Sequence, residues 1–148
     1  MKTILALIDF SDITPKILDH AHDFARAFGG DIVLMHVVPP EPLVVDFEPP
    51  AVSPDVFKER QQDLQALCDY LAQRRVSVTT AQFGGLVLET VLAQIGLLQP
   101  DVIIMGSHGH GALYHLLMGS ITEGVIKHAP LPVLVVPRVP AQEKPAPQ

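Results

Sequence analysis

Short apolar runs alternate along the chain with longer segments whose apolar residues recur at helical spacing. Five short runs are predicted to be strands, at residues 4–8, 31–37, 77–82, 102–105 and 133–136. All of them except residues 77–82 are mostly apolar on both faces, which is typical of strands buried in a parallel sheet. Strict alternation of such strands with helices predicts an α/β fold, in which helices cover both faces of a parallel sheet.

The four segments between the strands carry signals for the ends of helices. The predicted helices occupy residues 14–28, 53–75, 86–98 and 120–129. Thr14-Pro15 and Ser53-Pro54 each place a capping side chain before a proline, as helix starts often do. Ser120 precedes Glu123 at the spacing of a capping box, which predicts a fourth helix capped by Ser120.

Two proline-rich segments lie outside these elements. Residues 39–54 form a long predicted surface loop, whose apolar part, residues 43–47, is expected to lie on the body of the protein or to meet a partner. Residues 139–148 contain three further prolines and are predicted to be a disordered tail. The sequence therefore predicts one domain over residues 1–138.

Composition narrows the class of protein. Apolar residues make up 48% and charged residues 18% of the 148 residues, as in a globular domain. The net charge of −6 argues against a nucleic-acid partner, which would require a basic face. Cys68 is the only cysteine, the first apolar run stops at Asp9, and no stretch is long enough for a membrane helix. We therefore expect a cytoplasmic protein without a membrane partner.

The candidate chemistry is concentrated in a glycine-rich loop after the fourth strand. Gly106, Gly109 and Gly119 precede Ser120, where a helix is predicted to begin. Amides at a helix amino terminus favour an anion, so phosphate is the expected ligand. A Walker loop is excluded because no lysine precedes Ser120, and a Rossmann fingerprint is excluded because the first strand is not followed by a glycine motif.

The remaining pattern, Gly106-x2-Gly109-x9-Gly119-Ser120, resembles the ATP-binding signature of the universal stress proteins. The resemblance covers nearly the whole chain, from Ile8-Asp9 after the first strand to the closing segment 129–137. It implies a single-domain, Rossmann-like sheet of the adenine nucleotide alpha hydrolase type, with strand order 3-2-1-4-5. In that order the first and fourth strands are neighbours, and a ligand is expected beyond their carboxyl ends.

The resemblance also implies roles for individual residues. Asp9 should contact the ribose or a metal ion, the Val37 backbone should meet adenine, and Met105 should pack beside it. Backbone groups of the glycine loop and of the helix after it should hold the ribose and the phosphates. The complete expected nucleotide site is Asp9, Val37, Met105, Gly106, Gly109, Gly119, Ser120, Ile121 and Thr122.

Histidines around the loop raise the alternative of a metal site. His108 and His110 lie in the loop, and His36 and His115 are further candidates. No acidic residue or cysteine accompanies them at a recognisable spacing, so we expect no dedicated protein metal site. Mg²⁺ or Mn²⁺ is expected only together with ATP. The loop also offers no obvious catalytic base or cationic group for phosphoryl transfer, so no catalytic residue is predicted.

The expected function is that of an ATP-binding stress or signalling protein, which acts through nucleotide occupancy on an unknown client and hydrolyses ATP slowly at most. An adenylyl-transferring or ATP-hydrolysing enzyme on the same fold, and a module that binds AMP or cyclic AMP, stay open as alternatives. The resemblance further implies a homodimer through the edge strand Val133–Val136, since an apolar sheet edge requires cover.

Overall fold

The computed structural model describes residues 2–41, 51–108 and 118–138. Four helices alternate with five strands along the chain, as the apolar pattern predicts. The elements are β1 (Thr3–Leu7), α1 (Thr14–Phe28), β2 (Asp31–Val38), α2 (Pro54–Ala72), β3 (Val78–Gly84), α3 (Val87–Leu98), β4 (Val102–Gly106), α4 (Ser120–His128) and β5 (Val133–Val136). The predicted tail, residues 139–148, lies outside the described residues.

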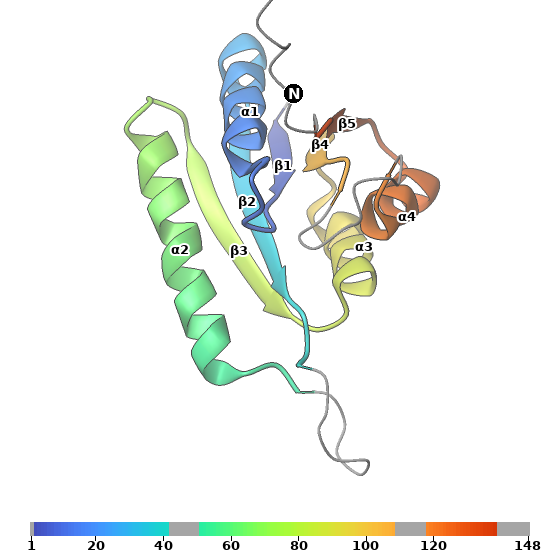
Figure 1. Cartoon of the computed structure of the whole chain (residues 1–148). Helices are drawn as coiled ribbons and strands as arrows, with labels where there is room; N and C mark the ends of the chain where they lie inside the picture. Colours follow the sequence, from blue (N-terminus) through green and yellow to red (C-terminus); the bar gives the residue numbers. More distant parts are fainter. Residues whose placement is uncertain (1, 42–50, 109–117, 139–148) are drawn as a thin grey trace, which may run out of the picture.

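All five strands are parallel, and their order in the sheet is β3-β2-β1-β4-β5. The predicted strand order is therefore confirmed. α1 and α2 cover one face of the sheet, and α3 and α4 cover the other (Figure 1). β1 shows why the sheet is buried on both sides: Ile4 and Ala6 pack toward α1 and α2, while Leu5 between them packs toward α3.

Two of the three predicted helix caps are wrong by one residue. The cap of α1 is Ile13, whose backbone is already helical (φ −81°, ψ −12°), and Thr14 lies within the helix. The cap of α4 is Gly119, with an extended backbone (φ −73°, ψ 157°), so Ser120 is the first helical residue and the capping box does not form. The third prediction is confirmed, since the Ser53 hydroxyl accepts a hydrogen bond from the Val56 amide at the start of α2.

Candidate functional site

A pocket of about 250 Å³ lies at the carboxyl ends of β1, β2 and β4, where α3 and α4 begin. This volume is slightly below the range of roughly 300–1,000 Å³ that is usual for small-molecule sites. Among the described residues, its walls are formed by Leu7, Ile8, Asp9, Met35, His36, Val37, Pro39, Val87, Val91, Met105, Gly106, His108, Ile121 and Thr122. β1 and β4 are the two neighbouring strands at which the strand order reverses, the place where ligands bind in open α/β sheets.

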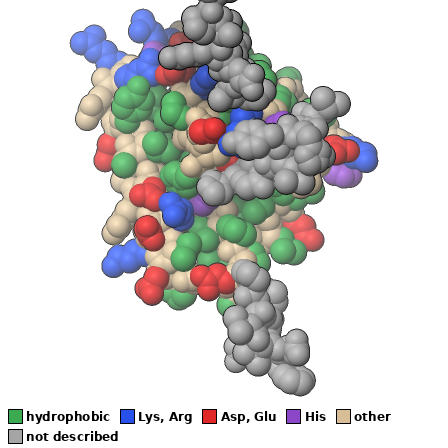
Figure 2. Space-filling view, viewed as in Figure 1, with side chains coloured by type: hydrophobic (Ala, Val, Ile, Leu, Met, Phe, Trp, Pro, Cys, Tyr) green, Lys and Arg blue, Asp and Glu red, His purple; other side chains and the backbone are tan. Residues whose placement is uncertain are grey.

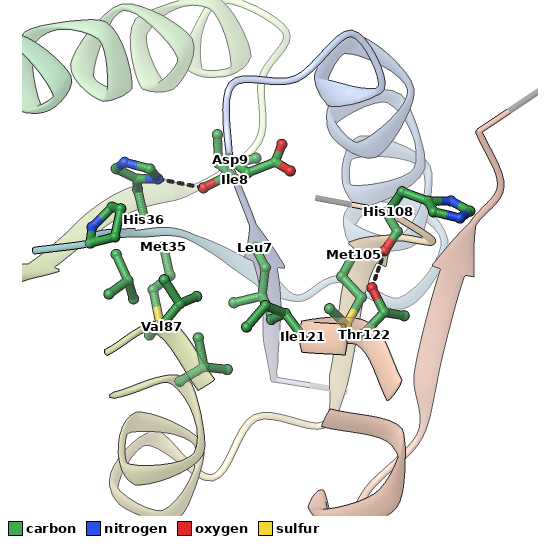
Figure 3. A pocket seen from close by; sticks show the side chains of 14 residues that line it. Leu7, Ile8, Asp9, Met35, His36, Val87, Met105, His108, Ile121 and Thr122 are labelled. Carbon is green, nitrogen blue, oxygen red and sulfur yellow. Dashed lines mark hydrogen bonds between the residues drawn. The ribbon is translucent and has the colours of Figure 1, made fainter. Parts of the chain in front are cut away.

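Apolar side chains form most of the pocket wall, and they come from both the sheet and the helices (Figure 3). Leu7 and Met105 approach from β1 and β4, Val87 approaches from the start of α3, and Ile121 approaches from the start of α4. Because charged groups are costly to bury in such surroundings, the apolar part of the pocket suits a flat, weakly polar group.

The turn after β1 gives the pocket its carboxylate. Asp9 lies in the wall, and its Oδ1 accepts a hydrogen bond of 2.9 Å from the Ser11 amide, which fixes the side chain relative to the turn. Between these two residues Phe10 has a φ of +61°, a left-handed backbone that costs an aromatic residue roughly 1–3 kcal/mol. The turn is therefore held in a strained conformation directly beside the pocket.

A buried histidine stabilises the same turn. His36 Nδ1 donates to the carbonyl of Ile8 over 2.6 Å (Figure 3), and the ring of Phe10 packs edge-on against the imidazole at 4.7 Å between centroids. Burial lowers the pKa of His36, and the nearby Arg60 acts in the same direction, whereas the hydrogen bond to Ile8 acts against both. Asp9 and Asp63 also lie close enough to oppose the lowering. His36 is accordingly neutral at pH 7.

The lowered pKa of His36 predicts a pH dependence of stability. A histidine whose pKa falls on folding stabilises the protein above its unfolded pKa of about 6.5, and this contribution is lost as the pH falls through the lower folded pKa. We expect the free energy of unfolding, measured with urea, to fall less between pH 7 and pH 5 in His36→Gln than in the unmodified protein. An equal fall in both proteins would contradict the assignment.

The loop after β4 is closed at its base by two hydrogen bonds. The Gly119 amide donates to the carbonyl of Ser107 over 2.7 Å, and the Thr122 hydroxyl donates to the carbonyl of Gly106 over 2.7 Å (Figure 3). The first hydrogen bond of α4 runs from the Glu123 amide to the carbonyl of Gly119, at 3.0 Å. The amides of residues 120–122 precede this bond, so they form the open, positive end of the helix.

The pocket brings together most of the residues predicted from the sequence. Six of them lie in its wall: Asp9, Val37, Met105, Gly106, Ile121 and Thr122. Gly119 and Ser120 lie at the start of α4, directly before the two residues of this helix that line the pocket. Gly109 lies outside the described residues. The Gly119 amide is already bonded to Ser107, so this glycine cannot offer its own N–H to a ligand.

The sequence did not indicate the part of the pocket wall that α3 forms. Val87 and Val91 line the pocket one helical turn apart, and their spacing is the same as that of residues that pack in the core. His36 was considered only as a metal ligand. Within residues 2–41, 51–108 and 118–138, no three His, Cys, Asp or Glu side chains come together in a way that could hold a metal ion. His110 and His115 lie outside these ranges.

Of the helices that the structure describes in these ranges, none combines the length and the apolar character needed to cross a bilayer.

Comparisons with known proteins match nearly the whole chain. Residues 1–137 match the family described as the Universal stress protein family. The chain is 28% identical over 155 residues to Universal stress protein MJ0577 of Methanocaldococcus jannaschii, covering 93% of this chain and 95% of that protein. It is 31% identical over 138 residues to a universal stress protein of Thermus aquaticus, covering 91% and 98%.

Solved structures show the same fold. The structure of MJ0577 superposes with a TM-score of 0.76 at 26% identity, over 95% of this chain and 98% of that chain. A universal stress protein from Archaeoglobus fulgidus in complex with dAMP gives a TM-score of 0.67 at 17% identity, over 91% and 96%. A universal stress protein in complex with cAMP gives 0.65 at 18% identity, over 91% and 96%. At these two identities the likeness concerns the fold alone.

Proposed function

Because the chain belongs to the universal stress protein family, we propose that it binds ATP in the pocket at the carboxyl ends of β1, β2 and β4, and that nucleotide occupancy is its signal to a client protein. The observation that carries the proposal is the meeting of Asp9 with the open amino end of α4 at one pocket. A carboxylate suits ribose hydroxyls, and helix amides suit phosphate.

The proposed pose follows from the chemistry of the walls. Adenine would lie against the apolar side chains, with the backbone of Val37 at its polar edge and Met105 beside it. The ribose would contact Asp9, and the phosphates would run along Gly106 to the amides of residues 120–122. Mg²⁺ or Mn²⁺ binds few protein carboxylates together with substrate phosphates, and Asp9 is the carboxylate that the described wall offers for this role.

Two related folds support an adenine nucleotide as the ligand, since their structures are described as complexes with dAMP and with cAMP. The same comparison keeps open the alternative that this chain binds AMP or cyclic AMP. ATP is favoured by the glycine spacing, which resembles the ATP-binding signature.

Rapid catalysis is not part of the proposal. Phosphoryl transfer depends on cationic groups at the phosphates, and the described residues that line the pocket include no lysine or arginine. Hydrolysis is therefore expected to be slow at most. Adenylyl transfer would additionally require a pocket for a second substrate, and release of pyrophosphate on addition of candidate acceptors would favour that alternative.

Calorimetry with ATP, ADP, AMP and cyclic AMP tests the proposal, together with mass spectrometry of any nucleotide that purifies with the protein. We expect saturable binding of one nucleotide per chain, with ATP bound more tightly than AMP. Tighter binding of cyclic AMP than of ATP would favour the alternative module. No binding of any of the four would refute the proposed site.

We further propose a homodimer in which β5 pairs with β5 of a second copy. β5 is an edge strand of four apolar residues, and such an edge promotes pairing unless it is covered. Nucleic acid is not a proposed partner, since Lys and Arg side chains are scattered among Asp and Glu on the face that Figure 2 shows. We propose a cytoplasmic location, which suits a chain whose single cysteine, the buried Cys68, offers no intrachain disulfide.

A further inference from the structure

The segment after β5 crosses back to the turn that follows β1. Arg138 forms an ion pair with Asp12, in which Nη2 donates a hydrogen bond of 3.2 Å to Oδ2 and Nε lies 3.1 Å from Oδ1. The arginine side chain is largely covered, at 17% exposure, while that of Asp12 is 65% exposed. Asp12 lies three residues after Asp9 of the pocket, so the ion pair places a guanidinium beside the turn that supplies the pocket's carboxylate.

The same arginine is also attached to the base of the glycine loop. Its amide donates to the Ser107 hydroxyl over 3.0 Å, and His108 Nδ1 lies 2.9 Å from that hydroxyl. Ser107 in turn accepts the hydrogen bond from Gly119, the cap of α4. Figure 3 shows the ring of His108 turned away from the apolar walls, toward the side on which β5 runs. Arg138 and the open amides of α4 are therefore joined through a single residue.

The charges around the pocket indicate a role for this ion pair. The charged side chain that lines the described wall is the carboxylate of Asp9, which repels a polyphosphate. The helix amides compensate for a single phosphate group, but each additional phosphate adds charge. A guanidinium binds a carboxylate and a phosphate with the same planar, two-pronged geometry. A phosphate group can therefore take the place of the Asp12 carboxylate as the partner of Arg138.

We propose that Arg138 binds the terminal phosphates of the nucleotide in exchange for Asp12, and that it thereby determines the preference for ATP over AMP. The inference rests on the proposed binding of an adenine nucleotide at this pocket. The glycine loop itself has no cationic side chain. Arg138, 18 positions after Ser120, would supply this charge. Asp12 acts as an internal competitor, which keeps the guanidinium in place before the nucleotide binds.

Calorimetry on Arg138→Gln with ATP and AMP tests the proposal. Since a bond between charged groups is lost only with the longer ligand, we expect ATP affinity to fall about tenfold and AMP affinity to change less than about twofold. Arg138→Lys should retain part of the ATP affinity. The matched control is Arg74→Gln, which removes a similar arginine–aspartate pair and should leave both affinities unchanged. Arg74, in the turn after α2, lies 3.0 Å from Asp19 of α1.

Asp12→Asn separates this role from a purely structural one. Removal of the competing carboxylate should strengthen ATP binding by about two- to fivefold, so the two variants act in opposite directions. If the ion pair only holds the turn in shape, both variants will weaken ATP and AMP alike, and the proposal is overturned. Equal ATP affinity in Arg138→Gln and the unmodified protein also overturns it, while leaving the proposed function intact. Failure of the unmodified protein to bind any nucleotide would remove both.

Discussion

Replacement of Gly119 by valine is expected to abolish measurable ATP binding, a loss of more than about a hundredfold, because the phosphates lose at least two charge-assisted hydrogen bonds. Gly119 is the cap of α4, and a side chain at the cap position lies over the first amides of the helix. A branched side chain there would occupy the space that the proposed phosphates need. Calorimetry with ATP measures the effect.

The fold should tolerate this change at Gly119. Its φ of −73° and ψ of 157° are extended backbone that any residue can adopt, so the glycine is not required for the conformation. Gly119→Ser makes the test sharper, because a serine hydroxyl would cap the helix and compete with phosphate for the same amides. We expect unchanged or higher thermal stability together with weaker ATP binding.

Gly96 on α3 supplies the matched control. A Cβ at this position would meet no heavy atom within 4 Å, so Gly96→Ala should leave ATP binding unchanged and stabilise the helix by about 0.5–1 kcal/mol. ATP affinity that is unchanged in Gly119→Val would show that the phosphates do not approach the start of α4, and the proposed pose would be wrong.

Local sequence patterns predicted the elements of this fold well, because four of the five strands are mostly apolar and each helix has a distinct end. The strand order came from the family resemblance, and it placed Asp9 and Gly106 at the same pocket although 96 residues separate them. The caps were less predictable. A Ser-x-x-Glu pattern marks a first helical turn, but it does not determine which residue takes the extended backbone, and at α4 that residue is Gly119.

Features that depend on tertiary contacts could not be read from the sequence. The hydrogen bond from His36 to Ile8 joins β2 to the residue after β1, and the ion pair between Asp12 and Arg138 spans nearly the whole chain. Phe10 has a left-handed backbone that no local motif indicates. The surroundings impose each of these arrangements, and all three lie at or beside the pocket. The residues that most distinguish this site are thus the ones for which local propensity is least informative.

A substitution in β5 should disrupt the proposed dimer, and the register of the sheet identifies the residue to change. The carbonyls of Pro132 and Val136 accept hydrogen bonds from Ile103 and Ser107, so these two residues face β4. Because successive residues of a strand face opposite sides, the N–H and C=O groups of Val133 and Val135 point to the free edge. Proline at 135 therefore removes an outward N–H and leaves the pairing with β4 in place.

Val135→Pro is expected to raise the dissociation constant of the dimer by more than about a hundredfold, since a twofold-symmetric pairing loses two hydrogen bonds and leaves two carbonyls unsatisfied. Light scattering at micromolar concentration should show a dimer for the unmodified protein and a monomer for the variant.

β3, at the opposite edge, provides the matched control. The carbonyl of Ser77 accepts from Ile32 of β2, so Thr80 faces outward, and Thr80→Pro removes an equivalent edge N–H. A dimer that survives Val135→Pro but dissociates in Thr80→Pro would place the interface at β3, because only the edge that carries the pairing is sensitive to the loss of its outward amide.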